Sequence, residues 1–279
     1  MEHFTRQGLT FDLTDAGPAD GAAVVLLHGF PEDRSSWDAI VPQLTAAGYR
    51  CLAPDQRGYS PRARPPGRRA YRIDELARDV LCMADHAGVD RFHLVGHDWG
   101  AAVAWHLAAH HPRRVQTLTA LSVPHTAAFL WAMRHSRQAF KSWYMLAFQV
   151  PGLAERSLGA DGGRRFVEAF TRSGLPREHA ERYSRRAGEL TGPLSWYRAL
   201  PWSARRPLPP VEVPTLFVYG EGDIALDRAG ADACGRWVTG DYRYEVVAGG
   251  GHWLPEVAAD RVGPMLLEHL AAHPTPASL

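Results

Sequence analysis

Cysteine is scarce in this sequence of 279 residues: Cys51, Cys82 and Cys234 are the only three, and they are widely spaced. No Cys-x-x-Cys or Cys/His ligand spacing is present, which excludes a disulfide scaffold and argues against a metal site. Isolated thiols in odd number favour a reducing compartment, and we expect a cytoplasmic protein. Long apolar runs are also missing, so neither a membrane span nor a signal-peptide core is expected.

An excess of charge of either sign is missing as well. The chain has 31 Lys and Arg against 30 Asp and Glu, a net charge of +1. Nucleic-acid-binding domains are typically basic, with a pI above about 9, so we expect no nucleic-acid partner. Lysine occurs once, at Lys141, which we attribute to coding bias. With 46% hydrophobic and 22% charged residues, the composition is that of a folded globular protein and excludes disorder.

Short apolar runs alternate with helical stretches in the first 121 residues. Such runs are typical of strands buried on both faces, and they lie at 23–27, 50–53, 92–95 and 115–121. Apolar residues at helical spacing occur between them, over 37–47, 73–87 and 101–110. The alternation predicts an α/β fold, with a mostly parallel sheet covered by helices on both faces.

The alternation then stops for about 80 residues. From 125 to 206 no strand-like run appears, and the segment is helical, aromatic and rich in Arg. The strand rhythm resumes at 215–219 and 242–247, with helices near 228–237 and 260–272. We therefore predict a core made of residues 1–124 and 207–279, with residues 125–206 inserted as a helical cap, or lid.

Charge is divided along the same boundary. Residues 126–206 hold 14 Lys and Arg against 6 Asp and Glu, a net charge of +8, and the remaining 17 and 24 give −7 elsewhere. This division favours a basic lid seated on an acidic body. Attraction of an anionic substrate or partner is the alternative.

The segment 96–100 (GHDWG) follows a predicted strand and opens a predicted helix. This is the context of the nucleophile elbow, in which two glycines flank the nucleophile in a tight, strained turn. The central residue here is Asp98, where acyl-transferring enzymes have Ser. A helix N-cap is the competing interpretation of Asp98, but the elbow spacing of the glycines favours catalysis.

A carboxylate nucleophile changes the expected reaction. It displaces a leaving group from saturated carbon and forms an ester of the enzyme, which water must then hydrolyse. The oxyanion formed in that hydrolysis needs backbone N–H donors. Trp99, directly after the nucleophile, and Phe30, at the end of the first buried strand, are the candidates for this oxyanion hole.

The water requires a base, and the base requires an orienting acid. His252 follows three glycines just beyond the last predicted strand, and Asp223 lies at the carboxyl end of the strand at 215–219. The chain order of nucleophile, acid and histidine is that of the hydrolase arrangement. Glu221 and Asp227 are the alternative acids.

The sequence resembles the α/β-hydrolase superfamily and, within it, the epoxide hydrolases along nearly its whole length. The matching segments are 28–31 with Trp37, 55–60, 96–100, 220–226 and 251–253. The resemblance implies hydrolysis of an apolar epoxide to a vicinal diol, with water and without metal or organic cofactor. Haloalkane dehalogenases share most of these segments, so a haloalkane or haloacid dehalogenase using Asp98 is the alternative. Asp98 argues against an esterase or lactonase, and the intact triad against a non-enzymatic binding protein.

Opening an epoxide leaves an alkoxide that must be protonated, and a tyrosine with a pKa near 10 can supply the proton. Family members typically use two lid tyrosines. Tyr144, within 143–152, and Tyr197, within 194–198, lie in segments similar to theirs. Apolar residues of the lid and Trp37 are expected to line a substrate tunnel; those of the lid are Phe129, Met133, Phe140 and Phe148.

Overall fold

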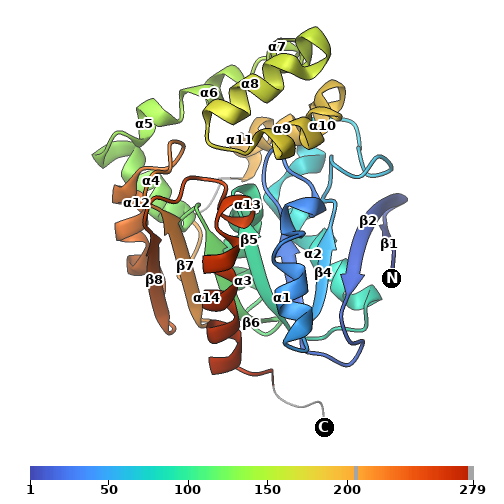
Figure 1. Ribbon diagram of the computed structural model, residues 1–279, viewed down its shortest axis with the longest axis vertical. Helices are drawn as coiled ribbons and strands as arrows, with labels where there is room; N and C mark the ends of the chain where they lie inside the picture. The colour runs from blue at the N-terminus through green and yellow to red at the C-terminus, as the bar shows by residue number, and fades with distance from the viewer. Residues whose placement is uncertain (204–206, 276–279) are drawn as a thin grey trace.

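The computed structural model describes residues 1–203 and 207–275, and within these residues eight strands form one sheet (Figure 1). Their order is β1-β2-β4-β3-β5-β6-β7-β8, with β1 and β2 antiparallel and the other six parallel. The strands are β1 (His3–Arg6), β2 (Leu9–Ala16), β3 (Ala23–Leu27), β4 (Arg50–Pro54), β5 (Phe92–His97), β6 (Val115–Leu121), β7 (Thr215–Gly220) and β8 (Tyr242–Val247). The predicted α/β fold is confirmed.

The six predicted strands lie within two residues of their expected bounds, but the hairpin of β1 and β2 was missed. Its apolar residues alternate with polar ones, because only one face of an antiparallel edge is buried. Phe11 and Leu13 of β2 are buried, and the Phe11 ring stacks on Phe4 of β1 at 4.6 Å. This alternation was the available signal, and it is weaker than the fully apolar runs of the central strands.

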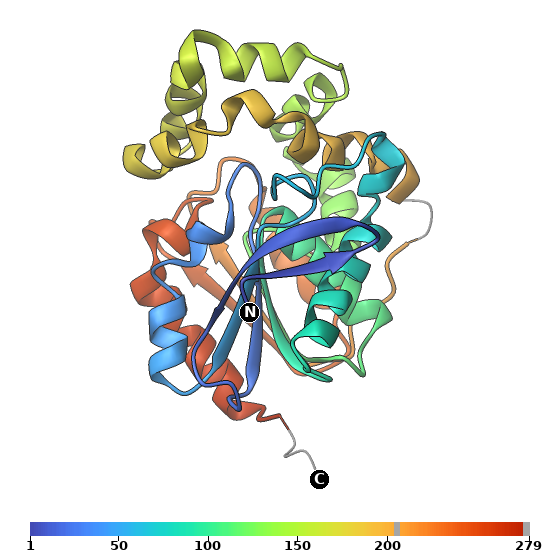
Figure 2. The same ribbon diagram turned by 90° about the vertical axis from the view of Figure 1, so that its right-hand side faces the viewer.

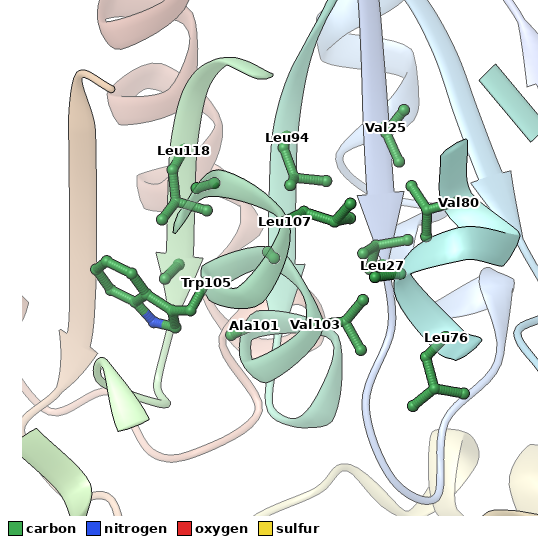
Figure 3. Close-up of a cluster of buried hydrophobic side chains, with 14 of the residues drawn as sticks. Val25, Leu27, Leu76, Val80, Leu94, Ala101, Val103, Trp105, Leu107 and Leu118 are labelled. Atoms are coloured by element: carbon green, nitrogen blue, oxygen red, sulfur yellow. The ribbon is translucent and has the colours of Figure 1, made fainter. Parts of the chain in front are cut away.

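Helices cover both faces of the sheet. One face packs against α1 (Val41–Ala46) and α14 (Ala259–Ala272). The other packs against α2 (Ile73–His86) and α3 (Trp99–His110), whose Leu76, Val80, Val103 and Leu107 meet residues of β3, β5 and β6 (Figure 3). The remaining body helices are α12 (Arg228–Ala233) and α13 (Leu254–Val257), with 3-10 turns at η1 (Arg34–Trp37), η2 (Arg68–Tyr71) and η5 (Cys234–Trp237).

The segment between β6 and β7 is helical, and most of it lies above the carboxyl edge of the sheet (Figures 1 and 2). Residues 204–206, at the end of the predicted cap, lie outside the described residues. Its elements are α4 (Thr126–His135), α5 (Gln138–Lys141), α6 (Trp143–Ala147), α7 (Leu153–Gly159), η3 (Ala160–Gly163), α8 (Arg164–Arg172), α9 (Arg177–Ser184), η4 (Ala187–Glu189), α10 (Thr191–Arg198) and α11 (Leu200–Ser203). Across the described ranges, no helix combines the length and apolar character needed to cross a membrane.

Ion pairs join the lid helices to the body. Arg186, just after α9, lies 3.5 Å from a carboxylate oxygen of Asp33 and 3.3 Å from one of Asp55. Arg182 of α9 lies 2.8 Å from Asp38. In these three pairs the lid provides the cation and the body the anion, as expected for a basic lid seated on an acidic body. A fourth pair has the opposite polarity, with Arg64 of the body 2.6 Å from Glu189 of the lid.

A buried charge cluster fixes the hairpin that the sequence did not reveal. Arg57, after β4, donates two hydrogen bonds of 2.7 Å to the carboxylate of Asp79 on α2. Arg6 of β1 donates to the same carboxylate at 2.8 Å and to Glu75 at 2.8 Å. Asp79 therefore holds together β1, α2 and the loop that follows β4.

Replacing Asp79 by Ala leaves the buried Arg57 guanidinium without its anion. We expect the free energy of unfolding, measured by urea denaturation at pH 7, to fall by about 3 to 5 kcal/mol. Asp74→Ala, at a half-exposed carboxylate on the same helix, is the control and should cost less than about 1 kcal/mol. Equal losses in the two variants would contradict the role of the buried pair.

Candidate active site

Asp98 stands on a strained turn between β5 and α3. Its φ and ψ are 48° and −118°, a left-handed conformation that non-glycine residues seldom adopt. A Cβ atom on Gly96 would overlap the backbone of Gly100, and one on Gly100 would overlap the carbonyl oxygen of Leu27. The Asp98 side chain makes no capping hydrogen bond to α3, so the N-cap interpretation is wrong.

The three residues predicted to form a triad come together above the strand ends. His252 Nδ1 lies 2.8 Å from Asp223 Oδ2, and His252 Nε2 lies 3.5 Å from Asp98 Oδ2. The second oxygen of Asp223 accepts the backbone N–H groups of Ala225 and Leu226 at 2.8 and 2.9 Å. The imidazole therefore bridges two carboxylates, and the nearer one, that of Asp223, is held in a fixed orientation.

Neither alternative acid occupies this position. Glu221 accepts the backbone N–H of Gly249 at 3.1 Å, and Asp227 caps α12 by accepting the N–H of Ala229 at 3.0 Å. Both carboxylates are thus engaged in local backbone contacts, and Asp223 is the acid that faces His252.

The Phe30 backbone N–H donates to Asp98 Oδ1 at 2.8 Å. Trp99 is the first residue of α3, where backbone N–H groups have no partner within the helix. The two predicted oxyanion donors therefore both lie next to Asp98, one on the loop after β3 and the other at the start of α3.

The charges of the triad are coupled. Burial alone would raise the pKa of Asp98, but the hydrogen bond and charge of His252, with the charge of His97 and the Phe30 amide, hold this pKa below its usual value. Burial alone would lower the pKa of His252, but the carboxylates of Asp223 and Asp98 raise it well above its usual value. The free site therefore holds an imidazolium between two carboxylates.

A second layer of residues, which sequence reasoning missed, fixes the backbone of His252. Its carbonyl oxygen accepts hydrogen bonds from Ser122 Oγ at 2.7 Å and His97 Nε2 at 2.8 Å. The other ring nitrogen of His97 lies 2.8 Å from Glu32 Oε1. His97 lies inside the elbow motif and Glu32 directly follows the 28–31 segment, so their positions were the available signal.

Glu32 also faces a second carboxyl group, that of Glu256. Tyr183 of α9 donates to Glu256 Oε1 at 3.1 Å, while Glu256 Oε2 is buried and has no hydrogen-bond partner among the described residues. Burial, and then the charge of Glu32, raise the pKa of Glu256 well above its usual value. Glu256 therefore keeps its proton more strongly than an exposed carboxyl group does, while the charge and hydrogen bond of His97 and the Gly29 amide hold the pKa of Glu32 below its usual value against the effect of burial.

The two lid tyrosines lie next to each other and close to Asp98. Tyr144 of α6 and Tyr197 of α10 have ring centroids 6.2 Å apart, and the Tyr197 ring lies 5.0 Å from Trp99 and 5.4 Å from Phe30. Burial raises the pKa of both phenols, and the negative charge of Asp98 raises both further. The pKa of Tyr197 is also raised by the neighbouring Tyr144. Both tyrosines therefore keep their protons at neutral pH.

The residues beside Tyr197 position it. Trp196 Nε1 donates to the backbone oxygen of Arg57 at 2.8 Å, which ties α10 to the body. Arg198 donates to the Phe148 carbonyl at 2.8 Å and pairs with Glu155 at 2.7 Å, which ties α10 to the segment that carries Tyr144. The Trp-Tyr-Arg sequence thus joins three parts of the molecule.

Lys141 was assigned no role from the sequence, but it connects the lid to the acid. Its Nζ atom donates to the backbone oxygens of Asp223 at 2.9 Å and Leu226 at 2.6 Å. No local pattern signals this contact, because its partners lie more than 80 residues away.

The predicted tunnel residues divide into those at the site and those elsewhere. Phe148 is at the site, with its ring 5.0 Å from Tyr197 and 5.6 Å from Phe30. The prediction that Trp37 lines the tunnel is wrong, because this side chain has no exposed surface and packs in the core between the sheet and α14. The prediction that Phe140 lines the tunnel is also wrong, because its side chain points to solvent with 78% of its surface exposed.

The last two predicted tunnel residues lie on α4. Phe129 is half-buried and packs against the core cluster on the α3 face of the sheet, away from the lid tyrosines. Met133 is half-buried and outside the aromatic cluster around Tyr197. The aromatic side chains packed around the tyrosines instead include Phe30, Phe170 and Trp253, two of them outside the lid.

Among residues 1–203 and 207–275, no cluster of three or more His, Cys, Asp or Glu side chains is arranged to hold a metal ion.

Comparison with known proteins gives consistent matches. A family model described as alpha/beta hydrolase fold matches residues 22–259. Epoxide hydrolase A of Mycobacterium tuberculosis is 35% identical over 94% of each chain, and the AB hydrolase superfamily protein YfhM of Bacillus subtilis is 35% identical over 94% of this chain and 95% of its own. The crystal structure of epoxide hydrolase A from Mycobacterium thermoresistibile superposes with a TM-score of 0.85 at 28% identity, covering 96% of this chain and 97% of that one.

The raised pKa of Glu256 makes stability depend on pH. In the unfolded chain, Glu256 has the ordinary pKa of 4.5 and loses its proton above that pH, whereas the folded state keeps this proton. The free energy of unfolding therefore falls as the pH rises from 4.5 to the raised pKa of the folded state. Glu256→Gln keeps an acceptor for the Tyr183 hydroxyl and has no titrating proton. We expect urea denaturation to show this variant gaining on the wild type by up to about 1.4 kcal/mol per pH unit between pH 5 and 7. Glu178→Gln, at an exposed carboxylate, controls for the loss of one charge. If the difference in free energy of unfolding between Glu256→Gln and the wild type stays constant from about pH 5 to 7, the raised pKa of Glu256 is contradicted.

Proposed function

This chain belongs to the alpha/beta hydrolase fold family and, within it, to the epoxide hydrolases, and on that premise we propose that it opens an epoxide to a vicinal diol through an ester formed on Asp98. The observation that carries the proposal is the placement of two protonated tyrosines, Tyr144 and Tyr197, beside a carboxylate at the nucleophile elbow. A carboxylate supplies the nucleophile for saturated carbon, and the tyrosines supply the proton for the oxygen that this carbon releases.

In the first step, a carboxylate oxygen of Asp98 attacks an epoxide carbon and the carbon–oxygen bond of the ring breaks. The alkoxide that leaves is about as basic as hydroxide, whose parent water has a pKa of about 15.7. It therefore takes a proton from Tyr144 or Tyr197. The raised pKa values of these phenols keep the proton in place until the ring opens.

The second step follows from the loss of charge on Asp98. Once this carboxylate is an ester, one of the two anions that raise the pKa of His252 is gone, and His252 can release its proton to the tyrosinate. The neutral imidazole then takes a proton from water, and the hydroxide adds to the carbonyl carbon of Asp98. The Phe30 and Trp99 N–H groups stabilise the oxyanion. When this intermediate collapses, the ester C–O bond to the substrate breaks, and the departing alkoxide takes the proton from the His252 imidazolium and leaves as the diol. The Asp98 carboxylic acid then gives its proton to the neutral His252, which restores the starting charges.

We propose that residues 125–206 act as the cap that closes this site. The rings of Phe30, Phe148 and Phe170 form edge contacts near the tyrosines, which favours an apolar substrate. The Asp98 ester would equally form from a haloalkane or haloacid, with halide as the leaving group, so the dehalogenase alternative is tested directly below.

Removal of the base should trap the intermediate. His252→Ala is expected to accumulate the Asp98 ester when incubated with an aryl epoxide, because no group remains to activate water. Intact-protein mass spectrometry should show a mass gain equal to the whole epoxide, mapped to the peptide with Asp98. His252→Ala/Asp98→Ala is the control and should gain nothing. An adduct from a haloalkane alone would establish the dehalogenase instead, and no adduct from either compound would contradict the covalent mechanism.

Removal of the proton donors should slow ester formation. We expect Tyr144→Phe and Tyr197→Phe each to lower the rate of the first step by about 10²- to 10⁴-fold, and the double variant to lose turnover altogether. Single-turnover kinetics of epoxide consumption measure this step apart from hydrolysis. Tyr71→Phe, at a buried tyrosine that hydrogen-bonds to Pro65 in the body, is the control. Unchanged rates in both lid variants would remove the tyrosines from the mechanism.

A further inference from the structure

Five large apolar side chains are exposed along one stretch of the lid. Phe140 of α5 is 78% exposed, and Trp143 and Leu146 of α6 are 67% and 76% exposed. Val150 and Leu153, which follow, are 50% and 45% exposed. Single exposed apolar residues are common on protein surfaces, but a contiguous group of this kind marks an interaction site. These five side chains are called the α5–α6 surface below.

The helix at the centre of this surface is apolar on both sides. Tyr144, Met145 and Phe148 pack inward against the lid cluster around Tyr197, while Trp143 and Leu146 point outward. A helix that borders water normally has a polar outer face, and one that is apolar all round is normally covered. The outer side of α6 therefore has the character of a covered face, although nothing in the described chain covers it.

The charge around the α5–α6 surface is entirely positive in sequence. Residues 126–154 contain Arg134, Arg137 and Lys141 and no Asp or Glu. The Lys141 Nζ is bound to two backbone oxygens, but Arg134 and Arg137 are exposed and form no ion pair within the described residues. Beyond Leu153, Glu155 is paired with Arg198, whereas Arg156 is exposed and likewise forms no ion pair within the described residues. The apolar patch is thus flanked by guanidinium groups that are available to an anionic partner.

We propose that the α5–α6 surface docks onto an anionic lipid bilayer, with its apolar side chains at the headgroup level and the flanking arginines on lipid phosphates. Outward Trp, Phe and Leu bordered by Arg are the features of interfacial helices. A second copy of this chain fits less well, because pairing through this face would bring two basic lids together. The surface is also much smaller than the about 20 to 30 residues per side of a stable protein interface.

Vesicle co-sedimentation tests this proposal. The wild-type protein should sediment with vesicles of phosphatidylcholine and phosphatidylglycerol, bind those of phosphatidylcholine alone at least about tenfold more weakly, and be released by added salt. Phe140→Ser/Leu146→Ser should reduce binding to anionic vesicles by about tenfold or more. Val257→Ser, at an exposed apolar residue of α13, is the matched control and should bind as the wild type does.

A charge-matched pair of variants separates local from general electrostatics. Arg134→Gln/Arg137→Gln should lose the preference for anionic vesicles, whereas Arg172→Gln/Arg177→Gln, with the same charge change on α8 and α9, should keep it. Unchanged circular dichroism and thermal unfolding establish that each variant is folded.

Three outcomes would overturn the proposal: no binding of the wild type to anionic vesicles, equal losses in the matched control variants, or a dimer in sedimentation velocity that Phe140→Ser/Leu146→Ser dissociates without changing vesicle binding. The measurements use no substrate, so they stand or fall independently of the proposed epoxide chemistry.

Discussion

The active site depends on one imidazole held between two carboxylates. His252 lies 2.8 Å from Asp223 and 3.5 Å from Asp98, and the two anions together outweigh the cost of burying its charge. Much of the surrounding structure keeps this arrangement in place. The elbow fixes Asp98 in a strained turn, two backbone N–H groups orient Asp223, and the His252 carbonyl accepts hydrogen bonds from Ser122 and His97.

The coupling of these charges also separates the two proposed chemical steps in time. With both anions present, His252 is charged and Asp98 is ionised, which suits attack on carbon. With Asp98 esterified, only Asp223 still raises the pKa of His252, which suits activation of water. In the proposed mechanism, this one change of charge on Asp98 separates the step that needs a nucleophile from the step that needs a base.

The sequence was sufficient for the features that depend on local spacing. The six parallel strands, the elbow around Asp98 and the Asp-His order were all read from short segments, because parallel strands are apolar throughout and their carboxyl ends meet at one edge. The fold and the family are confirmed, while the catalytic roles stay proposals. The edge hairpin was missed because only half of its residues are buried.

Features that depend on distant contacts were beyond the sequence. The direction of each lid side chain depends on how α5 and α6 pack, so Phe140 and Phe148, eight residues apart, could not be distinguished until the packing was known. Trp37 belongs to the core for a similar reason, since the turn that carries it packs against β3, β4 and α13. The Glu32–Glu256 pair joins residues more than 200 positions apart, and no periodicity indicates it.

The hydrogen bonds between Lys141 and the loop that carries Asp223 limit how the lid of this protein could be replaced by that of a relative. A single lid side chain holds the Asp223 and Leu226 carbonyls, so the lid and this loop are coupled through Lys141. A lid transplanted from a relative would have to bring its own donor to this loop. An exchange of lids would therefore also have to preserve the position of the loop that carries Asp223.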